Sequence, residues 1–414
     1  WANDPVEDRP SEIVYIRDEE TGQVWTVTPD PIGTSNLCEI THSAGYSQWR
    51  SNSHHLKQEL TILVAHEDPI KITRLKLKNT QGQARRLTVT YYAELVLGVT
   101  RSSSAPHIVT EFDPKTNALL ARNVWNADFS ERMAFLCTDR QVHGFTGDRA
   151  EFLGREGSFK SPAALARWGL SSAVGAKLDP CAALQVHVDV EANGEAEVLF
   201  LFGQGDNREH ARELIEKWQQ PQTLPDDWIK MRNRWLRLFN SVNVRTPEPS
   251  FDLMMNQWLL YQTLVCRIFA RCGLYQSSGA YGFRDQLQDV MALVYAEPAL
   301  ARKHILESAS HQFDMGDVLH WWHPPSGRGV RTHCSDDLLW LPYVTAYYVE
   351  VTGDNAILEE KVPFLTGDPL SSREENRYTL FESTSQAYSL FEHCKRALNR
   401  GISSSGEHGL LLIG

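Results

Sequence analysis

Three polar stretches of the chain carry most of the residues that could do chemistry. They are "GAYGFRDQLQD" at 279–289, "DMGDVLHWWHPPSGRGVRTHCSDD" at 314–337 and "TGDPLSSREENR" at 366–377. Each stretch precedes a segment of helical periodicity and gathers carboxylate, guanidinium, imidazole or indole groups. Because such groups hydrogen-bond and stack, we interpret the three stretches as candidate ligand-binding loops.

The first candidate is the neighbouring pair Arg284 and Asp285. A guanidinium beside a carboxylate supplies a fork of donors and an acceptor, the combination that fixes the hydroxyls of a sugar ring. Asp285 also lies where a helix begins, so a cap and a salt bridge would explain the same two residues. Spacing alone does not separate the two interpretations, and both stay open.

The second candidate is the carboxylate pair Asp336 and Asp337, which follows Ser335 before an apolar helix. A close pair of carboxylates suggests acid–base chemistry, with the pKa of one member raised. Ser-Asp-Asp is also typical of a helix start, where capping and the helix dipole favour acidic side chains. The pattern favours the capping interpretation over the catalytic one.

The second stretch also offers stacking and anion contacts. Trp321 and Trp322 could stack on sugar faces, whereas Trp340 lies inside an apolar helix and is expected in the core. Arg328 and Arg331 flank a glycine in "SGRGVRT", a cationic loop that could hold a phosphate or could be solvated.

The histidines of this stretch form a weak metal signal. His320 and His323 give an HxxH spacing, with His333 and Cys334 nearby, but the segment is rich in proline and lacks an ordered ligand pattern. We therefore expect no metal. His323 is interpreted as a hydrogen-bonding residue for a sugar hydroxyl or an anion.

Whole-chain properties exclude several classes of function. The 414 residues carry a net charge of -11, which argues against nucleic acid as a partner. The sequence has no Walker loop, no GxGxxG and no GxSxG, so nucleotide-binding and serine-hydrolase interpretations have no support. Seven cysteines without a CxxC pair indicate reduced thiols. A neutral or small ligand fits best.

The elements that must position these residues fall into two regions with different periodicity. From 13 to 205 the apolar residues alternate with period two, which predicts a large antiparallel β-sandwich over 1–205. In "PIKITRLKLKN" the alternation changes phase between Ile72 and Leu75. Two amphipathic helices follow, and we interpret 206–248 as linker helices between domains.

The region from 249 onward is predicted to be helical. Ser250 is the expected N-cap of a helix that runs to about 271. Later helices are expected at 286–296, 298–313, 336–352 and 381–399, joined by long loops at 272–285, 314–335 and 362–380. Five or six helices could close a small bundle, but several apolar faces would have no obvious partner.

Four segments of this region, in order, carry a resemblance to glycoside hydrolase family 94, the inverting sugar phosphorylases. They are "YQSSGAYGFRDQLQDVMAL", "HWWHPPSGRGVRTHCSDDLLWLPY", "TGDNAILEEKVPFL" and "EHGLLLIG". Upstream, "THSAGYSQWRSNSHHLKQELTILVA", "DRAEFLGREGS" and "LDPCAALQVHVDV" are most similar to the C-terminal phosphorylase-type domain of cyclic β-1,2-glucan synthases. The resemblance covers nearly the whole chain.

The resemblance implies a β-sandwich and linker helices followed by an (α/α)6 barrel. About twelve helices form such a barrel, so we expect 249–414 to be only its first, incomplete part. In the family a Trp-Asn-Asp motif with the general acid follows a segment like "HGLLLIG", so the acid is expected after Gly414 and no catalytic residue within the chain. The family's phosphate-site residues also come later. Gly279 stands where cellobiose phosphorylases have an Arg, which argues against cellobiose.

The function implied by the resemblance is inverting phosphorolysis of β-glucosidic bonds, with β-1,2-glucan as the expected substrate and α-glucose 1-phosphate as product. Inorganic phosphate is the co-substrate and no cofactor is expected. The implied partners are a β-glucan oligosaccharide and the missing C-terminal half of the barrel, with a homodimer as a further option. We expect a cytoplasmic location, compatible with a parent protein tethered to the inner membrane. The candidate substrate-binding residues are Tyr281, Arg284, Asp285, Trp321, Trp322, His323, Arg331, Asp336 and Asp337.

Two alternatives remain beside phosphorolysis. One is an inverting glycoside hydrolase that uses Asp336 or Asp337 with another carboxylate. The other is a glucan-binding or structural fragment without catalysis, since these 414 residues alone are expected to be inactive.

Overall fold

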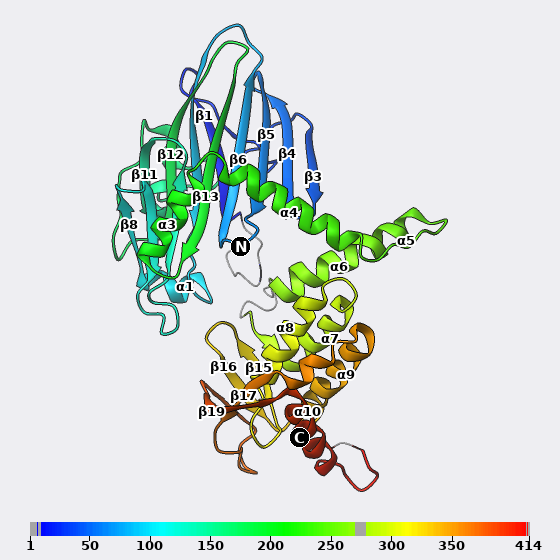
Figure 1. Cartoon of the computed structure of the whole chain (residues 1–414). Helices are drawn as coiled ribbons and strands as arrows, with labels where there is room; N and C mark the ends of the chain where they lie inside the picture. Colours follow the sequence, from blue (N-terminus) through cyan, green and yellow to red (C-terminus); the bar gives the residue numbers. More distant parts are fainter. Residues whose placement is uncertain (1–5, 7–9, 270–278, 411, 413–414) are drawn as a thin grey trace. The chain divides into compact units, whose positions relative to one another are not determined.

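The chain divides into two compact units, and the boundary between them along the chain falls within one helix. The computed structural model describes residues 6, 10–269, 279–410 and 412 (Figure 1). The first unit extends to Trp235 and the second begins at Leu236. Cys272 and the expected helix end at 271 lie outside the described residues.

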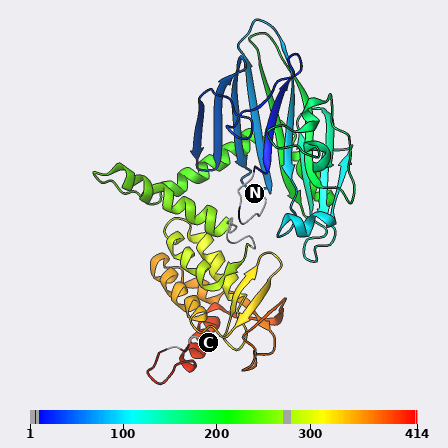
Figure 2. The ribbon, with the colours of Figure 1, turned by 180° about the vertical axis from the view of Figure 1, so that it is seen from behind.

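The first unit is an antiparallel β-sandwich, as the period-two pattern predicts (Figures 1 and 2). Its five-stranded sheet has the spatial order β11 (Val142–Asp148), β12 (Pro180–Val190), β7 (Arg85–Glu94), β1 (Glu12–Asp18) and β2 (Val24–Thr26). Its eight-stranded sheet has the order β3 (Cys38–Ser43), β4 (Tyr46–Ser53), β5 (Leu56–Val64), β6 (Ile70–Asn79), β13 (Glu195–Gly205), β10 (Met133–Thr138), β9 (Ala118–Asn123) and β8 (Ile108–Asp113). Alternate residues of both sheets meet in one apolar core.

Strand β6 explains the phase change noticed in the sequence. Leu75 and Leu77 belong to the core between the two sheets, whereas Ile70 and Ile72 belong to a second core on the outer face of the eight-stranded sheet. A strand with buried residues on both faces cannot keep a single alternation. The phase change therefore marks the point where burial moves from one face to the other.

The outer face is covered by α3 (Arg208–Trp218) and by the first part of α4 (Thr223–Phe239). Leu214, Ile215 and Trp218 of α3 are buried there. Asp227 of α4 accepts the backbone N–H of His66 at 3.0 Å. These helices therefore pack on the sandwich unit, and α4 also continues into the second unit, so the expected connector between domains has a packing role as well.

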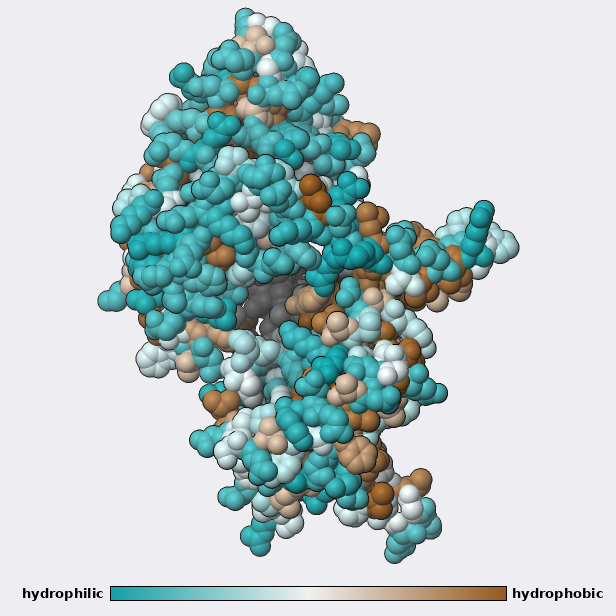
Figure 3. Space-filling model, in the orientation of Figure 1, coloured by the Kyte–Doolittle hydropathy of each residue, from teal (hydrophilic) through white to brown (hydrophobic). Residues whose placement is uncertain are grey.

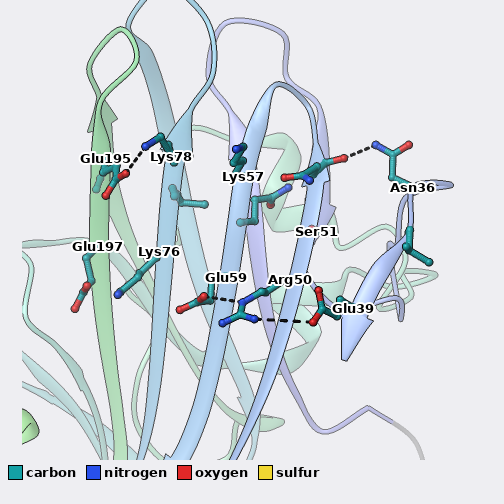
Figure 4. A pocket seen from close by; sticks show the side chains of 15 residues that line it. Asn36, Glu39, Arg50, Ser51, Lys57, Glu59, Lys76, Lys78, Glu195 and Glu197 are labelled. Atoms are coloured by element: carbon teal, nitrogen blue, oxygen red, sulfur yellow. Dashed lines mark hydrogen bonds and ion pairs between the residues drawn. The ribbon is translucent and has the colours of Figure 1, made fainter. Parts of the chain in front are cut away.

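The remaining end of the same outer face is polar and holds an open cavity of about 750 Å³ (Figure 4). Ion pairs cross neighbouring strands there: Arg50 lies 2.9 Å from Glu59, and Lys78 lies 2.7 Å from Glu195. Each exposed pair of this kind contributes a few tenths of a kcal/mol, ~0.2–1. Positive and negative side chains alternate, so this open surface has no preference for an anionic ligand.

The second unit contains helices and two small sheets. A continuous helical segment over 249–269 comprises α5 (Pro249–Leu253), η3 (Met254–Trp258), α6 (Leu259–Gln262) and η4 (Thr263–Phe269), the two η segments having π-helical hydrogen bonds. The other helices of the described residues in this unit are α7 (Phe283–Leu293), α8 (Pro298–Ala309), η5 (Asp337–Leu339), α9 (Trp340–Thr352), η6 (Asn355–Glu359) and α10 (Leu390–Ser403). The expected N-cap Ser250 is wrong: Glu248 caps α5 and Pro249 takes the first helical position, where a missing N–H costs nothing.

Strands occur in all three predicted loops, including β14 in the loop expected at 272–285, and in part of one predicted helix. One sheet has the order β14 (Tyr281–Gly282), β15 (Leu319–His323), β16 (Arg328–Thr332) and β18 (Asn376–Thr379), and the other pairs β17 (Lys361–Thr366) with β19 (Glu382–Ser389). The loops expected at 314–335 and 362–380 therefore contain strands, and the helix expected from 381 begins only at Leu390, capped by Ser389. Pairings such as β16 with β18 join distant segments, and their side chains are too polar to show an alternation.

Large apolar side chains line the 249–269 segment on more than one face. Leu260, Leu264 and Ile268 are buried. Other large apolar side chains of the segment are about half exposed, and apolar colour gathers along these helices in Figure 3. They are Phe251, Leu253, Met254, Trp258, Leu259 and Phe269. Within the described residues, no helix combines the length and apolarity that crossing a bilayer requires.

Candidate active-site cluster

The candidate site begins where the short strand β14 leads into α7. Gly282 is the N-cap residue of α7, and Asp285 lies exposed in the first turn. A Cβ atom on Gly282 would collide with the carboxylate of Asp285. The glycine therefore leaves space for a carboxylate that lies over the helix start, where the dipole favours negative charge.

Arg284, one residue earlier, faces the loop after β16. Its Nη1 donates to Oδ2 of Asp336 at 3.0 Å, and the two side chains are 41% and 34% exposed. The Sγ–H of Cys334 donates to the other oxygen of Asp336 at 3.0 Å. The capping role favoured from the sequence is wrong for Asp336: its side chain makes no capping hydrogen bond in η5 and instead accepts from a guanidinium and a thiol.

His320 and Asp337 form a second pair in the same cluster. Nδ1 of His320 lies 2.5 Å from Oδ2 of Asp337, whose side chain is only 2% exposed. The hydrogen bond to Asp337 raises the pKa of His320, which favours the imidazolium. We define Arg284, Asp285, His320, Asp336 and Asp337 as the charged cluster.

The consecutive aspartates do not behave as a proton-sharing pair, because each has its own partner. Burial alone would raise the pKa of Asp336, but hydrogen bonds from Cys334 and Arg284 bring it below its usual value. This direction is opposite to that expected for a carboxyl beside a second negative charge. Asp336 is thus an ionised hydrogen-bond acceptor at neutral pH.

Three atoms of the cluster region could be considered as metal ligands. Donor atoms of His320, Cys334 and Asp337 lie within 4.8 Å of one another. However, His320 and Asp337 already share a hydrogen bond, and burial followed by the neighbouring carboxylates raises the pKa of Cys334 to about 12. A protonated thiol is a poor ligand. The arrangement fits a hydrogen-bonded cluster better than a metal site.

The HxxH spacing falls on strand β15, which separates its two histidines. Residues three apart on a strand point to opposite faces. His323 lies with Trp321 on the face that carries Tyr378, with ring centroids of Trp321 and Tyr378 5.4 Å apart. These half-buried aromatic groups form a separate patch and do not join the charged cluster.

Two other expected ligand contacts are packing residues. Trp322 is 2% exposed, and its ring stacks on His311 with centroids 3.9 Å apart. Tyr281 is 8% exposed, packs edge-on against Trp322 and donates its hydroxyl to the carbonyl of Ile268 at 3.0 Å. This geometry favours structural roles for Trp322 and Tyr281.

Arg331 is also buried, and its guanidinium bonds only to groups of the protein. It is 1% exposed and donates from Nε and Nη2 to both oxygens of Asp317, at 2.6 and 2.9 Å. Its Nη1 donates to the carbonyls of Gly367 and Asp368, and its guanidinium lies 3.7 Å from the ring centre of Phe313. A structural role for Arg331 therefore replaces the ligand contact expected from the sequence.

A small cavity of about 220 Å³ lies beside the charged cluster. Cys334, which donates to Asp336 of the cluster, lines this cavity together with Arg400 and His333. The candidate residues selected from the sequence did not include Cys334, Arg400 or His320. The only sequence signal that could have placed His320 in the site was the HxxH spacing. For Cys334 the corresponding signal was its position two residues before Asp336.

The chain thus consists of a β-sandwich unit followed by a largely helical unit that carries the charged cluster. The family model described as the glycosyl hydrolase 94 supersandwich domain matches residues 1–221, and that of the glycosyl hydrolase 94 superfamily catalytic domain matches 234–414. The chain belongs to glycosyl hydrolase family 94.

Individual relatives agree with this family. The chain is 40% identical to the cyclic beta-(1,2)-glucan synthase NdvB of Rhizobium meliloti, over 100% of this chain and 15% of the relative. It is 27% identical to the solabiose phosphorylase of Paenibacillus borealis, over 96% of this chain and 49% of the relative. A bacterial glucoamylase complexed with acarbose shares the fold with a TM-score of 0.51 and 11% identity, over 85% of this chain and 56% of that one. The chain thus spans about half, or less, of each relative.

Proposed function

We propose that the protein takes part in inverting phosphorolysis of β-1,2-glucosidic bonds, giving α-glucose 1-phosphate. The glycosidic oxygen takes a proton from a general acid while a phosphate oxygen attacks C1 from the opposite face, so the C1–oxygen bond breaks as the C1–phosphate bond forms. Inorganic phosphate is the co-substrate, and the step requires no cofactor. Membership of the family and the phosphorylase among its relatives support this proposal.

The single observation that carries the proposal is the charged cluster at the start of α7. Asp336 occupies Nη1 of Arg284, and the guanidinium is 41% exposed, so it retains donors for a sugar hydroxyl. Asp285 is exposed beside it as an acceptor. The buried Asp337 holds His320 in one orientation. A fork of donors next to an acceptor suits the vicinal hydroxyls of a pyranose ring.

The proton must come from elsewhere in the protein. Asp336 is a poor general acid, because the hydrogen bonds from Cys334 and Arg284 hold its pKa low. We place the general acid and the phosphate-binding groups in a segment of the longer protein outside these 414 residues. The 414 residues alone are accordingly proposed to be inactive in phosphorolysis.

The same longer protein accounts for the apolar surface of the 249–269 segment. A helix with apolar side chains on more than one face is normally covered on each of those faces. The chain spans about half of its phosphorylase relative, so the rest of that relative's length could supply further elements for this role. We propose that 249–414 is the first part of an (α/α)6 barrel whose remaining helices cover this surface. A cytoplasmic location of the whole protein is part of the same proposal.

The test is to incubate the longer protein with linear β-1,2-glucan, with and without inorganic phosphate. Release of α-glucose 1-phosphate only when phosphate is present is the expected result. Release of free glucose independent of phosphate would support the inverting hydrolase instead, and glucose 1-phosphate release by residues 1–414 alone would refute the placement of the general acid. Asp285→Asn is the informative variant, with Asp314→Asn on the exposed loop after α8 as its control.

A further inference from the structure

A second polar region lies in the first unit, on the outer face of the five-stranded sheet. Arg17, Thr88 and His187 occupy one cross-strand row on β1, β7 and β12. Thr90, Gln185 and Gly144 occupy a neighbouring row of the same face. Further along, this face carries an apolar cluster under α2 (Arg149–Leu153) and η2 (Ala163–Ala166). The two polar rows therefore lie next to the apolar part of the face that α2 and η2 cover.

A short strap at 167–171 lies against the two rows. Nε2 of His143 donates to the carbonyl of Trp168 at 3.1 Å, and Nη1 of Arg17 donates to the carbonyl of Arg167 at 2.8 Å. The indole of Trp168 is 62% exposed, although its ring centroid lies only 5.3 Å from those of His143 and His187. A large apolar ring is thus held at the surface by imidazoles.

Buried polar atoms without a hydrogen-bond partner concentrate here. Of the seven such side-chain atoms among the described residues, four surround the strap. They are Nε of Arg17, Oε2 of Glu151, Oε1 of Gln185 and Nε2 of His187. Buried polar groups are nearly always satisfied, so a local concentration of unsatisfied ones points to a ligand or to a rearrangement that exposes them.

The hydrogen-bonding character of these atoms follows from their neighbours. The hydroxyl of Thr88 donates to Glu19 at 2.5 Å, so it can only accept from Nδ1 of His187 at 3.1 Å. Burial, followed by the charge of His143, lowers the pKa of His187 and keeps it neutral. Its Nε2 is then an acceptor, as is Oε1 of Gln185, whereas Nε of Arg17 is a donor.

The charges at this place are already balanced by protein partners. Arg17 lies 3.5 Å from Glu19, and Arg167 forms an ion pair with Glu151. An anionic ligand would therefore gain little. Hydroxyl groups, which both donate and accept, match a mixed set of donors and acceptors, and the CH-rich face of a pyranose ring matches an exposed indole.

We propose that this corner of the sandwich, the Trp168 site, is a non-catalytic binding site for a neutral glucan chain. A pyranose ring stacks on Trp168, and a small displacement of the strap brings its hydroxyls to Gln185, His187 and Arg17. Gly144 makes room for the amide, because a Cβ there would lie 3.1 Å from Oε1 of Gln185. The choice of β-1,2-glucan as the chain rests on the proposed function, whereas the site itself does not require catalysis.

Binding of linear β-1,2-glucan to residues 1–414 without phosphate tests the Trp168 site, by calorimetric titration. Trp168→Ala is expected to weaken binding about tenfold, the loss typical of a stacking aromatic group. The matched control is Trp125→Ala, because Trp125 is 76% exposed and also stacks on a histidine, His107. Its affinity is expected to stay within about twofold of the wild type.

A second variant separates ligand binding from packing. Gln185→Leu removes a buried amide whose Oε1 has no hydrogen-bond partner, so the melting temperature of the variant should not fall. Its glucan affinity is expected to drop about threefold, because a hydrogen bond from a sugar hydroxyl to Oε1 is lost. Unchanged affinity in both Trp168→Ala and Gln185→Leu, or loss of binding only in Asp285→Asn, would overturn the proposal. Absence of phosphorolysis in the longer protein would refute the proposed function alone and leave this titration valid.

Discussion

Two arginine–aspartate pairs of the second unit look alike in the sequence and differ in the structure. Arg331 and Asp317 form a bidentate pair in which the arginine is 1% exposed and every nitrogen donates to the protein. Arg284 and Asp336 share a single hydrogen bond, and both side chains are more than a third exposed. The first pair fixes the small sheet, and the second retains donors for a ligand.

The difference shows which property separates structural from ligand-binding charges. Net charge and residue type are the same in both pairs. The two arginines differ in how many of their N–H donors bond to other protein groups, and in how accessible the remaining donors are to water. Four ways to break or sharpen this comparison follow, from the largest expected effect to the smallest.

Removal of the buried arginine should have the largest effect. Arg331→Ala leaves Asp317 and two carbonyl oxygens without donors, and is expected to lower the free energy of unfolding by about 3–5 kcal/mol. Urea denaturation followed by circular dichroism measures this change. Arg373→Ala, at an exposed position, is the control and should change stability by no more than about 0.5 kcal/mol. Equal stability of the two variants would contradict the structural role of Arg331.

Acidification should lower the stability of the second unit, because the buried His311 resists protonation. Burial lowers the pKa of His311 to about 4, below the ordinary value near 6.5, so the unfolded chain binds more protons. The contribution of neutral His311 to the free energy of unfolding is fully present above pH 6.5. It is lost as the pH falls through 4, and the loss amounts to at most about 3 kcal/mol. Denaturation at pH 7 and pH 4.5 measures this loss. In His311→Gln that part of the pH dependence should disappear, whereas the exposed His333→Gln should retain it.

Substitution of the exposed arginine should affect catalysis more than stability. Arg284→Ala is expected to lower kcat/KM for phosphorolysis in the longer protein about tenfold to a hundredfold, by removing charged hydrogen bonds to the sugar. The free energy of unfolding should change by less than about 1 kcal/mol, because the pair with Asp336 is partly exposed. A large loss of stability with unchanged kcat/KM would reverse the roles assigned to the two arginines.

The smallest expected effect concerns the glycine before α7. In Gly282→Ala the added methyl group displaces the carboxylate of Asp285, because the two cannot occupy the same space. We expect kcat/KM to fall about threefold to tenfold, as a hydrogen bond is lost or lengthened. Gly353→Ala, where a Cβ meets nothing within 4 Å, would instead reveal backbone strain alone, since its φ is +72°. A drop in kcat/KM in both variants would weaken the assignment of Asp285.

Much of the fold could be predicted from the sequence where neighbouring residues determine it. Alternation predicted the sandwich, and the phase change in β6 recorded burial on both faces. The strands β15 to β19 could not be predicted in this way. The β16–β18 and β17–β19 pairings join strands that are not consecutive in the chain, and all of these strands are too short to show a clear periodicity.

The site shows the same limit. Arg284, Asp336 and Asp337 were recognisable as reactive groups, but their partners come from β15 and from the loop after β16. The burial of Arg331 depends on Asp317 and Gly367, which no local pattern connects to it. Whether an imidazole faces a carboxylate or a tyrosine depends on strand register, and β15 has a register irregularity between Leu319 and Trp321.

The double-sided burial of β6 has a consequence for how the protein can be divided. Strand β6 contributes side chains to two apolar cores, one on each of its faces. Helix α3 and the start of α4 cover the outer core and therefore belong to the sandwich unit. An excised sandwich that stopped at Gly205 would leave Ile70, Ile72 and Leu201 facing water, and such surfaces associate. A workable boundary for recombining this sandwich with other catalytic units therefore lies inside α4, beyond Met231.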